Sequence, residues 1–546
     1  MMEHFSKLGA PLYSIHEYQS LHEQEQRFKN AGWIQVHARS LWDLWSDDEF
    51  LSSFTRTSLD TVESFDEWEE FALFASHYFL LHASTRKQVE DHDSEMLDDS
   101  EEPSASDDYV LCPHIFPESD QRRYGALIPD SDQSLGHHGG LGRQTRLAST
   151  SLYSPSNEIT NPSHPFPPTR DIPARMCHKT TALRDNRCLL TGGRTSPAGG
   201  FQDCWLREEN QWKSIHSLPE PRYRHNAVKV LPQANSECVL IYGGKTSNGQ
   251  VLDTWILWSD DGHGWRHIET NSQKPLARFG ACLESINDTT GVLFGGIGKD
   301  NTILEDFWAW NLSQRSDGSF YLGLIKQTEK LRASPLFKYT SRFGTTVTRT
   351  AWGLVIAGGI IPRQIVPKDK EILLLDSTEL LRCLQSGDNS AWSNRLISTI
   401  GLGTDFHGPR PLLTGHAACA VHPDQVLFLG GGAVCFSFGT FWTEGTWLLE
   451  RTDSTVENTW KMDPKSVQPE GKPGTSALQS TSQGPALNMV DKIPVVPRIQ
   501  VQNTAQFQQI LADGKPVVIE GSNLGPCTEL WTKEYMANAV GSDRKV

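Results

Sequence analysis

The sequence predicts a mainly β protein, built around a six-bladed β-propeller with a smaller part at each end. Three observations favour this fold. Paired glycines recur, with the first four pairs starting at Gly139, Gly192, Gly243 and Gly295. An apolar stretch such as 239–242 runs into each pair, and a tryptophan or an aliphatic residue follows it. One such unit has two apolar faces and too little mass to bury both, so it needs copies of itself.

The repeats align on three marks. The six glycine pairs start at Gly139, Gly192, Gly243, Gly295, Gly358 and Gly430. The two wider spacings at the end indicate loop insertions, and the copy at Gly139 is the weakest. A basic residue with an aromatic residue or a histidine nearby precedes each pair, at Arg123, Arg175, Arg222, Arg278, Arg342 and Arg410. The strands after the later five pairs carry Trp205, Trp255, Trp308, Leu375 and Trp447.

These marks resemble the kelch repeat of β-propellers, and they predict a propeller over residues 116–462. Glycine permits a turn where a side chain would clash near the crowded axis. The tryptophans are expected to fill the wedges between neighbouring blades. Six blades that close into a ring leave only short strand edges. The alternative is an open β-sandwich in which the glycine pairs are coincidental.

The composition limits the class of protein. The chain has 546 residues, enough for three domains. It contains no run of ~18 apolar residues, so no membrane span is expected. Its first residues lack the basic and apolar regions of a signal peptide. The ten cysteines form no CxxC pair. We therefore expect reduced thiols in a cytoplasmic protein, with no disulfide framework and no zinc site.

The net charge of −16 argues against a globally basic surface for nucleic acid. Ten acidic residues lie between Glu90 and Asp108, where there is no lysine or arginine. A nucleic-acid partner would therefore need local basic patches. The candidates are Arg122, Arg123, Arg143 and Arg146 in one segment, and Arg170, Arg175, Lys179, Arg184 and Arg187 in another. The plainer interpretation is that these residues lie in solvated loops and at blade entries.

Residues 1–88 are predicted to form an α/β part. A helix at 24–28 ends near Gly32, and 33–36 forms a strand. Apolar residues at spacings of three and four predict one long helix over 59–75, followed by a buried strand over 77–81. This order of helix, strand, helix and strand is typical of the back half of an α/β domain.

Polar residues of this part have two interpretations each. The acidic residues of the long helix are Glu63, Asp66, Glu67, Glu69 and Glu70. They could serve acid–base chemistry, but on an amphipathic helix they are expected to form its solvated face. His77 is expected to be a packed or hydrogen-bonded histidine before a buried strand rather than a catalytic base. Arg27 is a candidate carboxylate contact because its guanidinium is a bidentate donor, with a structural ion pair as the alternative.

Two linkers separate the parts. Residues 89–115 are acidic and rich in serine, and residues 463–491 are rich in proline, serine, glycine and glutamine. Residues 492–546 are then predicted to contain a helix at 504–512, a strand at 515–521 and a further helix at 531–536. Within the propeller, His137 and His138 precede a glycine pair. Adjacent strand residues point to opposite sides, so a turn is favoured over a metal or phosphate site.

Several segments of the first part resemble the C-terminal third of the leucine carboxyl methyltransferase family. They are His4-Phe5, Gln26-Arg27-Phe28, Gly32-Trp33, Leu59-Asp60, residues 63–70 and Ser76-His77-Tyr78. The resemblance implies S-adenosylmethionine bound to a Rossmann-like sheet. The glycine-rich loop and ribose-binding acid of that family lie upstream of the matching segment. No cofactor contact is therefore carried over, the catalytic residues stay unassigned, and the chain is expected to be a fragment.

Residues 492–546 resemble the opening of a JmjC-type cupin domain, on the segments 493–499 and 515–521. The iron ligands of that family, a His-x-Asp pair and a later histidine, are expected beyond Val546. No metal site is therefore predicted in this chain.

A carboxyl methyltransferase part, a kelch-like propeller and a JmjC-like opening occur in this order in the tRNA wybutosine-synthesizing protein 4 family, which the chain resembles over nearly its whole length. The resemblance implies phenylalanine tRNA as partner and S-adenosylmethionine as cofactor. It also implies methylation of the side-chain carboxylate of the modified guanosine beside the anticodon, and then methoxycarbonylation of its amino group. No DNA or membrane partner is expected. The predicted substrate-binding residues are Arg27, Arg123, Arg175 and Lys179.

The implied methylation needs little from the protein's own acids and bases. A carboxylate is already ionised at pH 7, so catalysis is expected to rest on positioning. Two alternatives stay open at this stage. One is a methyltransferase that acts on the C-terminal leucine of a protein, and the other is a non-enzymatic kelch scaffold for protein partners.

Overall fold

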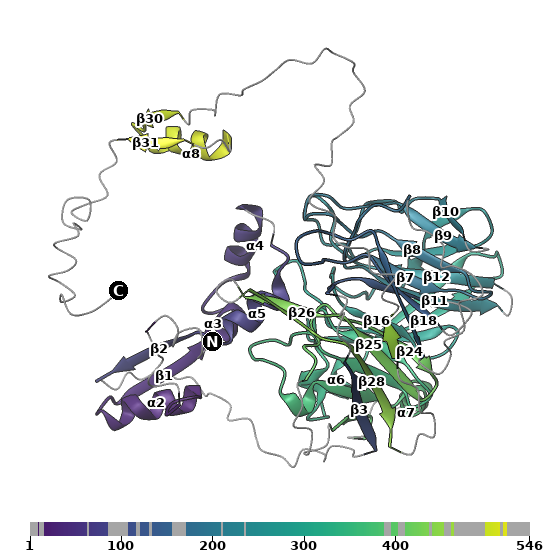
Figure 1. Ribbon diagram of the computed structural model, residues 1–546, viewed down its shortest axis with the longest axis horizontal. Helices are drawn as coiled ribbons and strands as arrows, with labels where there is room; N and C mark the ends of the chain where they lie inside the picture. The colour runs from purple at the N-terminus through teal and green to yellow at the C-terminus, as the bar shows by residue number, and fades with distance from the viewer. Residues whose placement is uncertain are drawn as a thin grey trace. The chain divides into compact units, whose positions relative to one another are not determined.

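Figure 1 shows a computed structural model of the chain. It describes residues 9, 16–62, 65–85, 108–115, 121–129, 134–155, 171–208, 211–233, 236–386, 392, 395–401, 410–435, 439–452, 460–462, 497–513 and 517–520. The chain divides into two compact units, Met1–Pro473 and Gly474–Val546, and each is described by itself.

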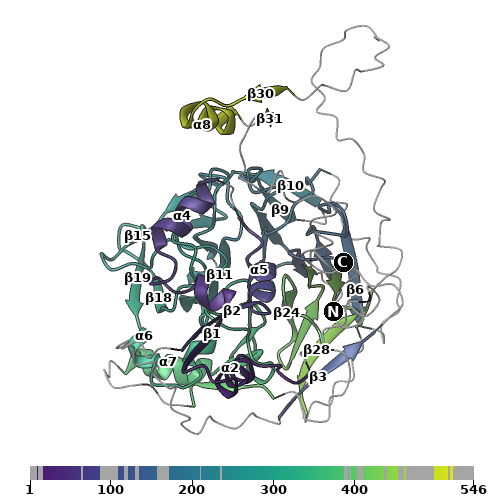
Figure 2. The same ribbon diagram turned by 90° about the vertical axis from the view of Figure 1, so that its left-hand side faces the viewer.

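Six sheets in the first unit form a six-bladed β-propeller, as predicted (Figures 1 and 2). The innermost strands of neighbouring blades contact each other all the way round the ring. Blade 1 consists of β4 (Ala126–Pro129), β5 (Leu135–His138), β6 (Thr150–Pro155) and β29 (Trp460–Met462). Blade 2 consists of β7 (Lys179–Ala182), β8 (Cys188–Thr191), β9 (Cys204–Glu208) and β10 (Gln211–Ile215). Blade 3 consists of β11 (Asn226–Gln233), β12 (Ser236–Tyr242), β13 (Trp255–Ser259) and β14 (Gly264–His267).

The other three blades follow the same plan. Blade 4 consists of β16 (Cys282–Ser285), β17 (Thr290–Phe294), β18 (Phe307–Gln314) and β19 (Phe320–Lys326), with the short β15 (Glu269–Thr270) parallel to β19. Blade 5 consists of β20 (Thr346–Arg349), β21 (Leu354–Ala357), β22 (Ile372–Leu375) and β23 (Ile397–Thr399). Blade 6 consists of β24 (Ala417–His422), β25 (Gln425–Leu429), β28 (Thr446–Arg451) and β3 (Tyr109–His114).

Two strands from opposite ends of the propeller sequence close the ring. β3 pairs with β28 as the outer strand of blade 6, and β29 pairs with β6 as the outer strand of blade 1. The two closing strands also meet, because the Trp460 amide donates to Nδ1 of His114 at 3.2 Å. The acidic linker predicted to reach residue 115 is therefore corrected: 109–114 belong to the propeller.

The wider spacing of the later glycine pairs reflects insertions, as predicted. The connections of blades 4 and 5 contain α6 (Thr328–Leu331), η1 (Phe337–Tyr339), η2 (Lys368–Lys370) and α7 (Ser377–Gln385). The α7 helix begins where the Asp376 carboxylate accepts the amides of Thr378 and Glu379. In blade 6, a hairpin of β26 (Gly432–Cys435) and β27 (Gly439–Trp442) follows the last glycine pair.

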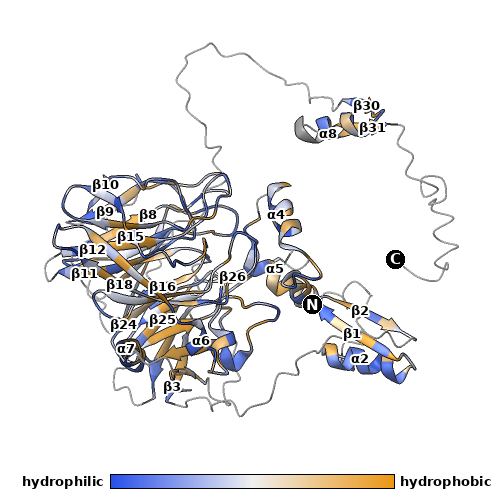
Figure 3. Cartoon of the chain, turned by 180° about the vertical axis from the view of Figure 1, so that it is seen from behind, coloured by the Kyte–Doolittle hydropathy of each residue, from blue (hydrophilic) through white to orange (hydrophobic). Residues whose placement is uncertain are grey.

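Apolar wedges between the blades hold the ring together, and Figure 3 shows the propeller strands largely in orange. Trp255 and Tyr242 of blade 3 pack in one cluster with Trp308 and Leu283 of blade 4. Trp447 joins blade 6 to blade 5 in another cluster. The prediction that tryptophans fill these wedges is confirmed for Trp255, Trp308 and Trp447, whereas Trp205 is half-buried. Burial of apolar surface is the main stabilising term expected for such a ring.

The glycine pairs link each blade to the next. The Gly193 amide donates to the Arg222 carbonyl at 2.9 Å, and the Arg222 guanidinium donates to the Gly243 carbonyl at 3.2 Å. The same linkage recurs round the ring, where Arg122, Arg175, Arg278 and Arg342 take the place of Arg222. Two blades use a residue other than the basic one named in the repeat. In blade 1 the linking residue is Arg122 and not Arg123, and in blade 6 Leu413 stands where Arg410 was expected.

The N-terminal part contains α2 (Leu21–Asn30), β1 (Gln35–Ser40), α3 (Leu41–Trp45), α4 (Ser53–Val62), α5 (Trp68–Ala75) and β2 (Phe79–Ser84). A capping box of Ser20 and Glu23 starts α2, which is mostly blue in Figure 3. β1 and β2 pair antiparallel. The predicted buried strand at 77–81 is wrong in its burial, because Leu80 is 52% exposed.

The predicted long helix over 59–75 is two helices, α4 and α5. The break has a physical reason: it leaves the carbonyls of Phe65 and Asp66 outside a helix, where they accept from propeller side chains. Arg224 donates to the Asp66 carbonyl at 3.2 Å, and Lys245 reaches the Phe65 carbonyl at 3.5 Å. Glu63 lies outside the described residues.

The second unit is described over 497–513 and 517–520. It contains β30 (Arg498–Gln500), α8 (Thr504–Asp513) and β31 (Val518–Glu520), and the two strands pair in parallel. The helix and the strand predicted here are confirmed. The helix predicted at 531–536 lies outside the described residues, and the JmjC-like assignment stays a prediction.

Candidate functional site

At the inner end of each blade, one residue near the axis has a left-handed backbone conformation. These residues are Tyr124, Cys177, Arg224, Gly280, Gly344 and Gly415, with φ between 51° and 70°. Their amides form a belt, because all but that of Gly415 donate to the equivalent carbonyl of the preceding blade. Cys177 donates to Tyr124 at 2.9 Å, and Arg224 donates to Cys177 at 3.0 Å. The hydrogen bonds of the belt stabilise the left-handed conformation, which costs a non-glycine residue about 1 kcal/mol or more.

Helix α5 closes one end of the channel, and Figure 2 shows it over the centre of the ring. Glu69 forms a bidentate ion pair with Arg224, with Nη1–Oε1 at 2.8 Å and Nη2–Oε2 at 3.0 Å. Asp66 pairs with Arg194 and, at 3.1 Å, with Nε of Arg224. These residues link the α5 region to blades 2 and 3.

A third acid extends the contact to blade 1. Glu70 pairs with Arg123 and accepts the Tyr124 hydroxyl at 3.2 Å. Burial and the nearby carboxylates of Glu69 and Glu70 raise the pKa of Tyr124 well above its ordinary value. Burial lowers the pKa of Arg224, but the carboxylates of Asp66 and Glu69 outweigh it, so the pKa lies well above the ordinary value. Burial raises the pKa of Glu69, and its contact with the Arg224 guanidinium opposes this shift. The bidentate geometry of the two side chains is that of a charge-assisted pair.

This arrangement contradicts the predicted solvated face for three of its acids, whereas Glu67 is exposed as predicted. Asp66, Glu69 and Glu70 are 4%, 0% and 6% exposed. The amphipathic pattern places acids opposite the apolar face, but the residues that pair with them lie more than fifty positions away in the sequence. Such acids are buried because a complementary set of guanidinium groups covers them.

Apolar packing surrounds the ion pairs. Trp42 and Trp68 of the N-terminal part share a cluster with Phe279 and Phe343 of the propeller. The Trp42 indole also donates to the Ile361 carbonyl at 2.8 Å. Farther out, Lys245 pairs with Asp60 at 3.1 Å. The N-terminal part and the propeller therefore meet through one continuous interface with a charged centre and an apolar surround.

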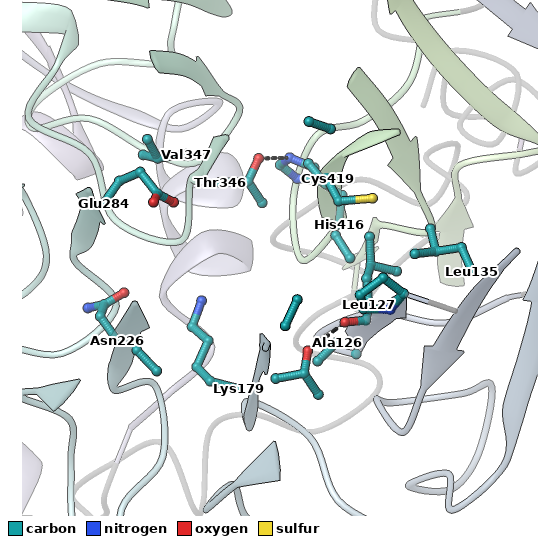
Figure 4. A pocket seen from close by; sticks show the side chains of 18 of the residues that line it. Ala126, Leu127, Leu135, Lys179, Asn226, Glu284, Thr346, Val347, His416 and Cys419 are labelled. Carbon is teal, nitrogen blue, oxygen red and sulfur yellow. Dashed lines mark hydrogen bonds between the residues drawn. The ribbon is translucent and has the colours of Figure 1, made fainter. Parts of the chain in front are cut away.

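On the other side of the axial belt lies a cavity of about 500 Å³, lined by the innermost strands of all six blades. Figure 4 shows Lys179, Asn226 and Glu284 with their polar ends directed into it. They come from β7, β11 and β16 of three successive blades, and Thr346 of β20 continues the polar side. Ala126, Leu127, Leu135 and Cys419 of blades 1 and 6 line the rest.

The charged groups of this cavity attract each other, and Arg349 also attracts Glu284, but none of these contacts is an ion pair in the described structure. Within the described residues, neither the Lys179 ammonium nor the Glu284 carboxylate has an ion pair with another residue, and Glu284 accepts only from neighbouring Ser285. Burial within the channel lowers the pKa of Lys179. Burial also raises the pKa of Glu284 to about 7, although contacts with Ser285 oppose the shift. Lys179 is exposed to the open cavity and Glu284 is half-buried, so a ligand in the cavity can reach both groups.

Buried histidines between the blades have a structural role. His225 and His416 share hydrogen bonds with the hydroxyls of Thr191 and Thr346, at 2.8 and 2.9 Å. Burial holds the pKa of His225 well below its ordinary value and lowers that of His416 to about 3. His138 shares a hydrogen bond with Thr150 at 3.0 Å. In the described part of the chain, no three His, Cys, Asp or Glu side chains are grouped to hold a metal ion.

The four residues predicted to bind substrate lie in different places. Arg27 is exposed on α2, with its guanidinium 5.1 Å from the Tyr18 ring. Arg123 is buried against Glu70 at the closed end of the channel. Arg175 is buried in a bidentate pair with Asp203, at 2.7 and 2.6 Å. Lys179 alone lines the open cavity, so the structure does not bring the four together.

Sequence reasoning missed the other polar residues of the cavity, although a signal was present. Lys179 and Asn226 each stand four positions after a linking arginine, Arg175 and Arg222. The same position holds Ala126, Cys282, Thr346 and Ala417 in the other blades. Because the first strand of every blade faces the axis, this alignment predicts which side chains share the channel.

A family model described as the tRNA wybutosine-synthesizing protein 4 β-propeller matches residues 172–445. Proteins named tRNA wybutosine-synthesizing protein 4 from Aspergillus fumigatus and Aspergillus oryzae are each 59% identical over all of this chain, which covers 51% and 53% of their lengths. The Saccharomyces cerevisiae protein of that name is 27% identical over 82% of this chain and 61% of its own length. The chain thus spans about half the length of its most similar curated relatives. From the propeller match and these identities, the chain belongs to the tRNA wybutosine-synthesizing protein 4 family.

Proposed function

We propose that this chain acts in tRNA modification, in the biosynthesis of wybutosine on phenylalanine tRNA. The observation that carries the proposal is the 59% identity, across the whole chain, to two proteins that bear that name. The reactions proposed are methylation of the side-chain carboxylate of the modified guanosine and then methoxycarbonylation of its amino group. The family resemblance of the N-terminal part supports a carboxylate as the methyl acceptor.

The residues described here support a positioning role for the propeller. A methyl transfer to an ionised carboxylate needs alignment more than acid–base help. The buried pairs of Glu69 with Arg224 and of Glu70 with Arg123 hold the methyltransferase-like part on a rigid ring. A displacement of ~1 Å between a methyl donor and its acceptor lowers the reaction rate steeply. We therefore propose that this interface keeps the substrate aligned with the methyl donor.

The methyl donor proposed is S-adenosylmethionine, which supplies an electrophilic methyl group when bound. Residues 16–62 and 65–85 contain one glycine, Gly32, and its Cβ position is open to space. These residues therefore do not fit the glycine-rich loop that the resemblance implies for the cofactor. We assign no cofactor contact to them, and Arg27 and Lys179 are retained as proposed substrate contacts.

The partner proposed is phenylalanine tRNA, held by local basic patches because the net charge is −16. The eight described cysteines are free thiols, which supports the proposed cytoplasmic location. None of the described helices is long and apolar enough to span a membrane.

A chimaera tests the proposed function. The chain replaces the matching half of its Aspergillus fumigatus relative, and this chimaera is expressed in yeast lacking its own tRNA wybutosine-synthesizing protein 4. Mass spectrometry of nucleosides from phenylalanine tRNA is expected to detect the methylated product. A chimaera that folds, binds S-adenosylmethionine and yields no methylated nucleoside would count against the proposal.

Two other activities have distinct outcomes in the same assay. A methyltransferase of protein C-termini would transfer labelled methyl groups to a peptide that ends in leucine and not to tRNA. A non-enzymatic scaffold would transfer to neither substrate. The match of the propeller itself to the wybutosine family favours the tRNA activity.

A further inference from the structure

The open cavity of the propeller has a polar side and an apolar side. Lys179, Asn226 and Glu284 stand on three successive inner strands, and Figure 4 shows empty space between the ammonium and the carboxylate. Leu127 and Leu135 face them from blade 1. A ligand that matches this cavity carries an anionic group, a cationic group and an apolar body.

The two charges are available because the protein does not use them. The nearby guanidinium of Arg224 is fully engaged by Asp66 and Glu69 on the closed side of the belt. In the described residues, the Lys179 ammonium and the Glu284 carboxylate form no ion pair with each other or with other residues. Lys179 is exposed to the open cavity and Glu284 is half-buried, so both groups are free to pair with a ligand that enters it.

We propose that the open cavity binds an α-amino acid head group with an apolar side chain. Lys179 pairs with the carboxylate of the ligand, and Glu284 accepts hydrogen bonds from its ammonium group. The Asn226 amide and the Thr346 hydroxyl lie beside them as neutral partners. The apolar side chain packs on the side lined by Leu127 and Leu135. A cavity of about 500 Å³ has room for an aromatic amino acid with water beside it.

Two kinds of compound could supply the α-amino acid head group. One is a free amino acid, and the other is the amino-acid side chain of the modified guanosine considered under the proposed function. Only the second source rests on that function. The site itself is argued from the cavity, so its failure would leave the proposed tRNA activity untouched.

Calorimetric titration of the full chain tests the site with three matched probes. The probes are L-phenylalanine, L-phenylalaninamide, which lacks the carboxylate, and 3-phenylpropionate, which lacks the amine. We expect L-phenylalanine to bind about tenfold or more tightly than either analogue, because each analogue leaves one charge of the cavity unpaired.

Two substitutions assign the contacts. K179M is expected to abolish the preference for L-phenylalanine over its amide, and E284Q to abolish the preference over 3-phenylpropionate. The matched controls are K213M and E208Q, which alter an exposed pair on blade 2. Both controls are expected to bind L-phenylalanine as the parent chain does.

A second arm distinguishes the sources, with the modified nucleoside titrated in place of L-phenylalanine. Binding of either compound that depends on Lys179 and Glu284 supports the proposal, and the tighter compound identifies the source. The proposal is overturned if neither compound binds, if the three probes bind equally, or if binding is unchanged in K179M and E284Q.

Discussion

The two sides of the axial belt use charge in opposite ways. On the closed side, Arg224 and Glu69 are buried and satisfy each other. On the open side, Lys179 and Glu284 face the same cavity without an ion pair among the described residues. Yet Arg224 and Asn226 are two residues apart in the sequence. The comparison teaches that the segment entering blade 3 serves two purposes, attachment of the N-terminal part and presentation of a binding surface.

The largest effect is expected on the closed side. R224A leaves Glu69 and Asp66 buried without their guanidinium partner, so the free energy of unfolding should fall by about 3–5 kcal/mol. Denaturant titration followed by tryptophan fluorescence measures the loss. R315A, which breaks an exposed pair with Glu269, is the control and should change stability very little. Equal effects of the two substitutions would show that the buried pairs do not stabilise the interface.

A smaller effect is expected where the blades approach each other. A Cβ on Gly295 would overlap the carbonyl oxygen of Arg342, whereas Gly249 has open space around its Cβ position. Both glycines have positive φ, at 63° and 82°, so an alanine would suffer similar backbone strain at either position. G295A should therefore cost about 2 kcal/mol more than G249A in thermal or denaturant unfolding. Equal losses would mean that the linkage tolerates a side chain.

The pH dependence of stability follows from the buried histidines. His225 has a pKa lowered by burial, so the unfolded state binds its proton first as the pH falls below about 6.5. Stability is therefore present above that pH and is lost below it, by about 1.4 kcal/mol per pH unit for one such histidine.

The measurement for this prediction is the unfolding free energy at several pH values between 7 and 5. H225Q should flatten the slope relative to the parent chain, whatever its effect at pH 7. H263Q, at an exposed histidine, should leave the slope unchanged. The raised pKa of Glu284 makes stability rise as the pH falls, which opposes the effect of His225. The slopes of the variants are therefore compared with that of the parent chain. A parent slope retained in H225Q would contradict the assignment.

The smallest effect is expected on the open side. Because Lys179 has no ion pair to lose in the described structure, K179M should keep the free energy of unfolding within ~0.5 kcal/mol of the parent. Denaturant titration of K179M and R224A under the same conditions compares their losses of unfolding free energy directly. A loss as large as that of R224A would show that Lys179 is structural and would remove the distinction between the two sides.

The propeller could be predicted because its signals are local and repeated. Each glycine pair lies close in sequence to the strand that follows it, and the same pattern recurs six times along the chain. The closing strands could not be predicted in this way. Residues 109–112 are apolar and suited to a strand, but β3 pairs with residues more than three hundred positions away, and the local sequence does not identify that partner.

The candidate site was predicted only in part. Lys179 was identified as a basic residue, but its partners Asn226 and Glu284 come from other blades, and only the ring brings them together. The acids of α5 looked like a solvated face because amphipathic periodicity cannot report a charged partner surface. Arg123 and Arg175 were chosen for charge alone, and charge does not tell whether a guanidinium is buried in an ion pair.

The most direct test of the account is a double-mutant cycle on Glu69 and Arg224. Unfolding free energies are measured for E69Q, R224Q and the double variant. The account predicts that the double variant loses about 2–3 kcal/mol less than the sum of the single losses, since each single variant strands a buried charge. Losses that add within ~0.5 kcal/mol would contradict the claim that this pair joins the N-terminal part to the propeller.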